Sequence, residues 1–93
     1  MSARLSGLTI GALTLDPTFD PDVTSYTANT KNATNTVSAT PEDESAAVTI
    51  LNGEIPVTSG QAATWTEGVN TVTITVKNGT AQKAYTVTVT KST

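Results

Sequence analysis

Two stretches of this chain alternate threonine with apolar residues, and they constrain its fold more than any other feature. Residues 71–76 read TVTITV and residues 85–90 read YTVTVT. Successive side chains of a β-strand point to opposite faces of the sheet, so the apolar residues share one face and the threonines the other. The pattern predicts two half-buried antiparallel strands, whose buried faces are formed by Val72, Ile74 and Val76 and by Tyr85, Val87 and Val89.

The rest of the chain also favours short strands separated by turns. Threonine occupies 21 of the 93 positions, and its β-branched side chain favours strand over helix. We expect further strands at residues 8–15, 23–30, 36–40, 47–51, 54–57 and 61–66. Seven or eight short strands, separated by Gly, Pro and Asn turns, predict an all-β, immunoglobulin-like sandwich of two antiparallel sheets, with a closed barrel as the alternative.

Several turns can be interpreted individually. Gly11 interrupts the first alternating segment, which suggests a β-bulge or a switch between sheets. Residues 16–22, DPTFDPD, contain two prolines and predict a loop, from which Phe19 folds back to cap the core. Asn52-Gly53 predicts a type I′ turn between strands 47–51 and 54–57, and Asn78-Gly79 begins the last connection.

Length and composition exclude most catalytic chemistry. Ninety-three residues make a single domain, placed at 1–93 with its core at about 5–91. The absence of cysteine and histidine excludes Ser-His-Asp and Cys-His catalysis and thiolate metal sites. A single small sandwich rarely provides the cleft that a carboxylate-pair glycosidase needs. We therefore expect a protein that is not an enzyme, with no catalytic residue, resident metal or cofactor.

Charge and hydropathy restrict the partners. Five basic residues against eight acidic ones, with no basic stripe, predict no nucleic-acid binding. No stretch is apolar enough to span a membrane, so we expect no membrane insertion. The opening residues, MSARLSGLTIGALTL, lack the pattern of a signal peptide. We expect a domain excised from a longer protein, whose neighbouring domains would be its partners.

Two acidic loops form a candidate calcium site. Asp16, Asp20 and Asp22 share the loop at 16–22, and Glu42, Asp43 and Glu44 share the loop at 41–45. Calcium takes six to eight oxygen ligands, commonly including several carboxylates. The favoured interpretation is that the aspartates form turns and that the second loop is solvated. The sequence does not require the two loops to lie at the same end of a sandwich.

Other polar patterns have a functional and a structural interpretation. Outward-facing Thr71, Thr73 and Thr75, with Thr86, Thr88 and Thr90, form a hydroxyl array that fits weak binding of glycans, ice or another sheet, or simply a soluble β-surface. A sugar-binding surface needs exposed aromatic rings, whereas we expect most of Phe19, Tyr26, Trp65 and Tyr85 to be in the core. The glycosylation patterns at 32–34 and 78–80 are expected by chance in a chain of this composition.

The order of these motifs resembles the bacterial cadherin-like β-sandwich domain. That family begins with a leucine-rich strand and a Pro-Phe-Asp-Pro turn ahead of Thr-Ser-Tyr, and the residues that match this opening are Leu5, Leu8, Ile10, Leu15, Pro17, Phe19, Asp20, Pro21, Tyr26 and Thr27. The segments 48–53 and 67–80, the second with Gly68-Val69-Asn70, and 84–91 also match. Trp65 takes the place of an aliphatic residue of the family, so by analogy it belongs to the core.

The resemblance covers about residues 5–91 and implies a fold more specifically than a function. It implies a non-catalytic module of a larger bacterial surface or phage virion protein, such as a tail protein, located outside the cell or in the virion. Such a module acts as a spacer or as a weak adhesive unit for cell-surface glycans. A dedicated carbohydrate- or calcium-binding module is the alternative. No site residue is carried over, because the resemblance brings none.

Overall fold

The computed structural model describes residues 3–11, 13, 15–16, 18–20 and 22–92. These residues form strands, turns and loops, and no helix among them is long and apolar enough to cross a membrane. Pro17 and Pro21, which belong to the predicted turn and to the family resemblance, lie outside the described residues. The strands are β1 (Leu5–Ile10), β2 (Ser25–Thr30), β3 (Thr34–Pro41), β4 (Ala47–Asn52), β5 (Ile55–Val57), β6 (Gln61–Thr64), β7 (Gly68–Asn78) and β8 (Ala81–Lys91).

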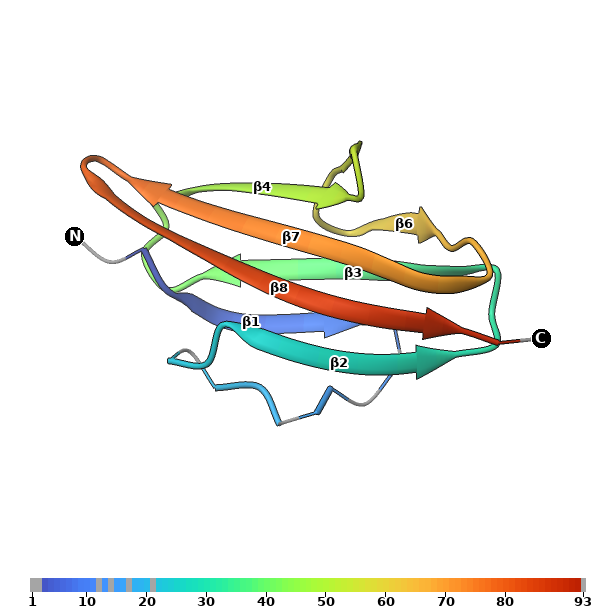
Figure 1. Cartoon of the computed structure of the whole chain (residues 1–93). Helices are drawn as coiled ribbons and strands as arrows, with labels where there is room; N and C mark the ends of the chain where they lie inside the picture. The colour runs from blue at the N-terminus through green and yellow to red at the C-terminus, as the bar shows by residue number, and fades with distance from the viewer. Residues whose placement is uncertain (1–2, 12, 14, 17, 21, 93) are drawn as a thin grey trace.

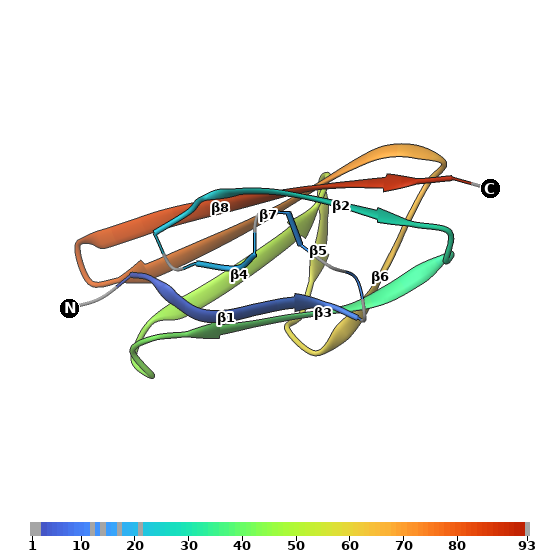
Figure 2. The ribbon, with the colours of Figure 1, turned by 90° about the horizontal axis from the view of Figure 1, so that it is seen from below.

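The eight strands form two sheets that pack face to face, which confirms the predicted β-sandwich. One sheet has the order β1-β3-β6 and the other the order β2-β8-β7-β4-β5. Figure 1 shows the strands running along the length of the molecule, and Figure 2 shows the sheets as two layers. The chain crosses between the layers after β1, β2, β3, β5 and β6.

One strand pair departs from the expected antiparallel arrangement. β2 and β8 are parallel neighbours, with Ser25 opposite Thr86 and Thr30 opposite Lys91. Parallel neighbours cannot be joined by a short hairpin, and the chain between β2 and β8 is long because it forms β3 to β7. Here β1 ends near the C-terminal end of the molecule, and the following segment runs back along the sandwich before β2 begins (Figure 1).

The two alternating segments supply the centre of the core, as predicted. Val72 lies opposite Val87 and Ile74 opposite Tyr85, and all four are 0% exposed. Burial of an aliphatic or aromatic side chain of this size contributes about 1.5–3 kcal/mol. These residues join Leu5, Leu8, Ile10 and Val37 of the other sheet in one cluster. The sheets are therefore held together by side chains from the faces that the sequence pattern identifies.

The first strand differs from its prediction in position. β1 begins at Leu5 and ends at Ile10, whereas we expected a strand at 8–15. Gly11 does not form a bulge: it ends the strand in a turn, with φ of +56° and its N–H donating to Thr36 O at 2.6 Å. The expected switch between sheets follows this turn, since β1 pairs with β3 and Asp16 then pairs with Thr27 of β2 in the other sheet. A Cβ at this position would lie 2.7 Å from Asn35 Nδ2. The irregularity in β1 lies instead between Leu5 and Gly7.

Both Asn-Gly turns begin one residue later than expected. Asn52 is the last residue of β4 and lies opposite Ile55, so the turn residues are Gly53 and Glu54. Gly53 has φ of +64°, and no described residue other than glycine has a positive φ. The predicted type I′ turn is therefore wrong, because that turn needs two positive φ values; glycine in the first turn position fits type II′. The second turn is similar, since Asn78 pairs with Ala81 and Gly79 has φ of +62°.

Candidate functional site

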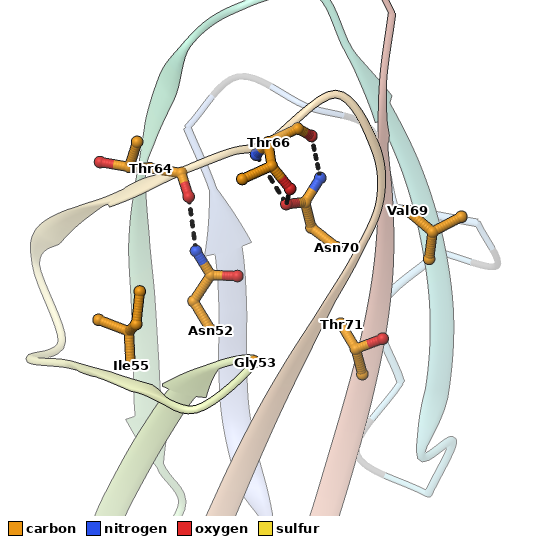
Figure 3. Close-up of a pocket in the computed structure, with 8 residues that line it drawn as sticks. All are labelled: Asn52, Gly53, Ile55, Thr64, Thr66, Val69, Asn70 and Thr71. Carbon is orange, nitrogen blue, oxygen red and sulfur yellow. Dashed lines mark hydrogen bonds between the residues drawn. The ribbon is translucent and has the colours of Figure 1, made fainter.

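A hollow of about 320 Å³ lies where the β4–β5 turn meets the β6–β7 connection. Its volume is at the small end of the range for small-molecule sites, about 300–1,000 Å³. None of the residues that line it carries a charge; they are Asn52, Gly53, Ile55, Thr64, Thr66, Val69, Asn70 and Thr71. The side chains of Asn52 and Ile55 point toward β6, whereas those of Val69 and Thr71 lie on the far side of β7 (Figure 3).

Asn70 fixes the wall of this hollow that connects β6 to β7. It is only 7% exposed. Its Oδ1 accepts hydrogen bonds from the Thr66 N–H at 2.9 Å and the Thr66 hydroxyl at 3.1 Å (Figure 3). Its Nδ2 donates to the carbonyl oxygens of Thr66, Gly68 and Val89. One amide group thus satisfies five polar groups, and the connection is built around it.

Asn52 joins the two sheets at the same hollow. Its Nδ2 donates to Thr64 O at 2.7 Å, which links the end of β4 in one sheet to the end of β6 in the other (Figure 3). The neighbouring Gly53 N–H donates to Thr71 O at 2.8 Å. Two exposed aliphatic residues lie beside these contacts: Ile55 and Val69 are each 66% exposed. The hollow therefore combines an uncharged polar lining with apolar surface at its rim.

The predicted threonine face covers the outside of the five-stranded sheet. Thr71 lies opposite Thr88, which lies opposite Thr27, and Thr73 lies opposite Thr86. Neighbouring strands are about 4.8 Å apart, so these hydroxyls form rows across three strands. Thr73, Thr75, Thr86, Thr88 and Thr90 are half-buried by their neighbours and Thr71 is exposed. The predicted array thus exists as a surface, and it borders the hollow at Thr71.

The aromatic residues are in the core, as expected. Tyr26, Trp65 and Tyr85 are 2%, 4% and 0% exposed. Phe19 is half-buried and stacks on Tyr26, with ring centroids 5.8 Å apart. The Tyr26 hydroxyl donates to Asp20 O and accepts from the Asp20 N–H. These are the only aromatic residues of the chain, so its surface offers a sugar no fully exposed ring to stack on and only part of the Phe19 ring.

Arg4 connects the two acidic loops, which lie at the same end of the molecule. Its guanidinium donates to Asp22 Oδ1 at 2.8 Å and to Glu42 Oε2 at 3.0 Å. The hydrogen bond and the charge of Glu42, followed by the charge of Asp22, raise the pKa of Arg4. A calcium ion bound between Asp22 and Glu42 would have to displace this guanidinium. Among the described residues, no three Asp, Glu, His or Cys side chains are grouped closely enough to hold a metal ion.

The remaining predicted calcium ligands have other positions. Asp16 forms a backbone bridge with Thr27, and Asp20 Oδ1 accepts a hydrogen bond from the Asp22 N–H at 2.9 Å. Glu44 is exposed. Asp43 Oδ1 accepts hydrogen bonds from Ser45, and its Oδ2 accepts one from Asn78 Nδ2 at 2.9 Å. The acidic residues are thus used mainly to shape their own loops.

The two glycosylation patterns differ in accessibility. Asn32 is exposed in the turn between β2 and β3. Asn78 is only 4% exposed, and its amide contacts Asp43 and the Ser45 hydroxyl. A glycan on Asn78 would need both contacts to break, whereas Asn32 is open to modification in the folded domain.

The hydrogen bonds to Asp43 predict a contribution to stability that depends on pH. Hydrogen bonds from the Ser45 N–H, then from the Ser45 hydroxyl and the Asn78 amide, lower the pKa of Asp43 below its ordinary value of 3.8. A folded-state pKa below the unfolded value adds stability above the unfolded pKa, and this stability is lost as pH falls through the folded pKa. We expect Asp43→Asn to lower the melting temperature near neutral pH and the difference from wild type to shrink between about pH 5 and pH 2.

Thermal denaturation of both proteins across this pH range tests the expectation. Glu44→Gln removes the same charge from a neighbouring exposed position and serves as the control. A difference between wild type and Asp43→Asn that stays constant with pH would show that the carboxylate of Asp43 is not the group responsible.

The sequence indicated some of these residues but not their contacts. Gly68-Val69-Asn70 was recognised only as part of a family pattern, and the hydrogen bonds of Asn70 give that pattern a physical role. Asn52 and Asn78 were assigned to turns, although their side chains connect distant parts of the chain. No sequence pattern predicts the ion pairs of Arg4, because its two partners are 18 and 38 residues away in the chain.

The family model described as "Cadherin-like beta sandwich domain" matches residues 5–92, from the first residue of β1 to the residue after β8. No curated protein matches the chain.

Proposed function

Because the chain belongs to the cadherin-like β-sandwich domain family, we propose that it is a non-catalytic spacer module of a larger bacterial surface or phage virion protein. It would act outside the cell or in the virion and contact the neighbouring domains of its parent. Its mechanism is positional: a rigid sandwich sets the distance between the domains before and after it.

The placement of the first and last strands carries this proposal. β1 begins at one end of the molecule and β8 ends at the other, along the longest dimension (Figures 1 and 2). The extents of the molecule are 42 × 24 × 17 Å. A chain that enters at one end and leaves at the other adds its length, rather than its width, to a multidomain protein.

Small-angle X-ray scattering of one copy and of two copies joined in tandem tests the spacer role. We expect the maximum dimension to grow by close to the 42 Å length of the module. Growth close to the 24 Å or 17 Å widths would mean that neighbouring copies pack side by side, and would contradict a spacer.

The hollow at the β4–β5 turn supports a second role, weak adhesion to neutral sugars of cell-surface glycans. Its lining offers hydroxyl and amide groups without a charge, and the exposed Ile55 supplies apolar surface for the C–H face of a sugar. A neutral polyhydroxylated ligand matches this combination better than a charged one. Without a fully exposed aromatic ring, the affinity should be low.

A nitrogen–proton NMR titration with N-acetylglucosamine, glucose, galactose and rhamnose tests this adhesive role. We expect shifts confined to amides around Asn52, Gly53 and Thr66, and their loss in Ile55→Asp but not in Thr9→Asp, which adds the same charge to an exposed position of the other sheet. A spectrum in which no sugar changes any chemical shift would refute the adhesive role. Adding calcium tests the alternative, which predicts shifts around Arg4 and Glu42.

A further inference from the structure

We infer that this module resists tension applied along its chain, and that the parallel pair of β2 and β8 is the element that resists it. The inference rests on the proposed spacer role, because only a module joined to others at both ends is pulled from both ends. It names a mechanical property that the spacer role by itself does not require.

Parallel pairing determines how the two strands separate under tension. β2 begins and β8 ends at opposite ends of the pair, with Ser25 opposite Thr86 and Thr30 opposite Lys91. A force that pulls the start of β2 one way and the end of β8 the other way slides the strands along each other. The ladder hydrogen bonds lie across the strands, so sliding loads all of them together. By contrast, when an antiparallel hairpin is pulled at its two free ends, its ladder hydrogen bonds break one after another.

The surroundings of β8 add to this resistance. β8 lies between β2 and β7 and pairs with β7 from Ala81 to Lys91. The pair with β2 is closed at both ends by hydrogen bonds, from the Thr86 N–H to Thr24 O at 2.7 Å and from the Ser92 N–H to Thr30 O at 2.9 Å. Sliding β8 outward would also drag its buried side chains through the core, namely Tyr85, Val87 and Val89.

β1 is the weaker element in the path of the force. It is a six-residue edge strand that pairs only with β3 and has an irregular register near Leu5. Besides the packing of its buried side chains, β1 contacts the other sheet through a hydrogen bond, which the Leu5 N–H donates to the Tyr85 hydroxyl at 3.1 Å. We expect β1 to detach first under tension.

Detachment of β1 leaves β2 held in place. Two backbone hydrogen bonds join Asp16 to Thr27 of β2, at 2.8 and 2.9 Å. The Tyr26 hydroxyl, also on β2, exchanges two hydrogen bonds with the backbone of Asp20. The connection before β2 is therefore anchored on β2 itself, and tension that passes β1 reaches the start of this strand.

Single-molecule pulling through engineered cysteines tests the inference, and the absence of native cysteine makes the attachment specific. In Thr24→Cys/Ser92→Cys the handles lie at opposite ends of the β2–β8 pair. In the matched control, Lys31→Cys/Ser92→Cys, both handles lie at the same end. All three positions are exposed, and thermal denaturation verifies that both variants fold. A third experiment pulls the wild-type chain by its two termini.

We expect a several-fold higher unfolding force for the Thr24–Ser92 handles than for the Lys31–Ser92 handles at the same pulling speed. When the chain is pulled by its termini, the detachment of β1 should appear first, as a small extension at low force. The rest of the domain should then unfold at a force close to that measured with the Thr24–Ser92 handles. Equal forces for the two handle pairs would overturn the inference. A low force for the termini alone would also overturn it, because tension would then bypass the β2–β8 pair. Neither result would affect the spacer role, which the scattering experiment tests separately.

Discussion

Replacing Trp65 with alanine should destabilise the fold by about 3–5 kcal/mol. The side chain is 4% exposed, and its Nε1 donates to Asn35 Oδ1 at 2.8 Å. The substitution removes the largest side chain of the core and leaves a cavity. Domains of this size have a total free energy of unfolding of about 5–15 kcal/mol, so the loss is a large part of the total and the urea midpoint of Trp65→Ala should fall far below that of wild type. Urea denaturation followed by circular dichroism measures the loss.

Two further variants separate the contributions of Trp65. Trp65→Phe keeps most of the ring but loses the hydrogen bond to Asn35, so it should destabilise the fold less than alanine does. Ile55→Ala truncates a side chain that is 66% exposed and should change the stability by no more than about 0.5 kcal/mol. Near-native stability of Trp65→Ala would refute the core assignment.

Replacing Asn70 with alanine should destabilise the domain by about 3 kcal/mol, although it removes only a small polar side chain. The amide of Asn70 satisfies polar groups of Thr66, Gly68 and Val89. A buried polar group left without a partner costs about 1–3 kcal/mol, and several groups lose their partner at once. Urea denaturation gives the size of the loss, and NMR shows whether it begins in the β6–β7 connection.

Asn70→Asp distinguishes the hydrogen bonds from the packing. Aspartate keeps the shape and the acceptor for Thr66, but its carboxylate would face the carbonyl oxygens of Gly68 and Val89. We expect this variant to be at least as unstable as Asn70→Ala at neutral pH, and to recover partly in acid, where a protonated carboxyl group donates one hydrogen bond. Asn29→Ala, at an exposed position of β2, is the control and should cost little. Equal stability of Asn70→Ala and wild type would contradict the role of the amide.

The alternating segments made the fold class predictable. A strand of period two with threonine on one face has only one way to bury its apolar residues, so Val72, Ile74, Val87 and Val89 could be assigned to the core from sequence. The position of Trp65 followed from the family pattern. These features depend on residues close together in the chain, and the alternation of neighbouring residues is what a sequence pattern reports directly.

Features that depend on distant residues could not be predicted. Whether β2 joins β8 in parallel depends on the path of the preceding connection, and the alternation within β2 is the same in either direction. The Asn-Gly turns begin one residue later than expected because Asn52 and Asn78 still pair across the hairpins, with Ile55 and Ala81, and the amides of both residues contact distant groups, Thr64 and Asp43. The hollow had no sequence signal, since its lining comes from four separate strands and their turns.

The most direct test of the spacer account is the distance between the two ends of the folded domain. Spin labels on Ser6→Cys/Ser92→Cys, both exposed positions near the start of β1 and the end of β8, allow this distance to be measured by double electron–electron resonance. The Leu5 N–H contacts the Tyr85 hydroxyl across the sandwich, and Ser92 follows Tyr85 by seven residues, so the account predicts a single distribution centred at about 25 Å. A distribution centred near the spacing of two packed sheets, about 10 Å, would place both ends on the same side and contradict the account.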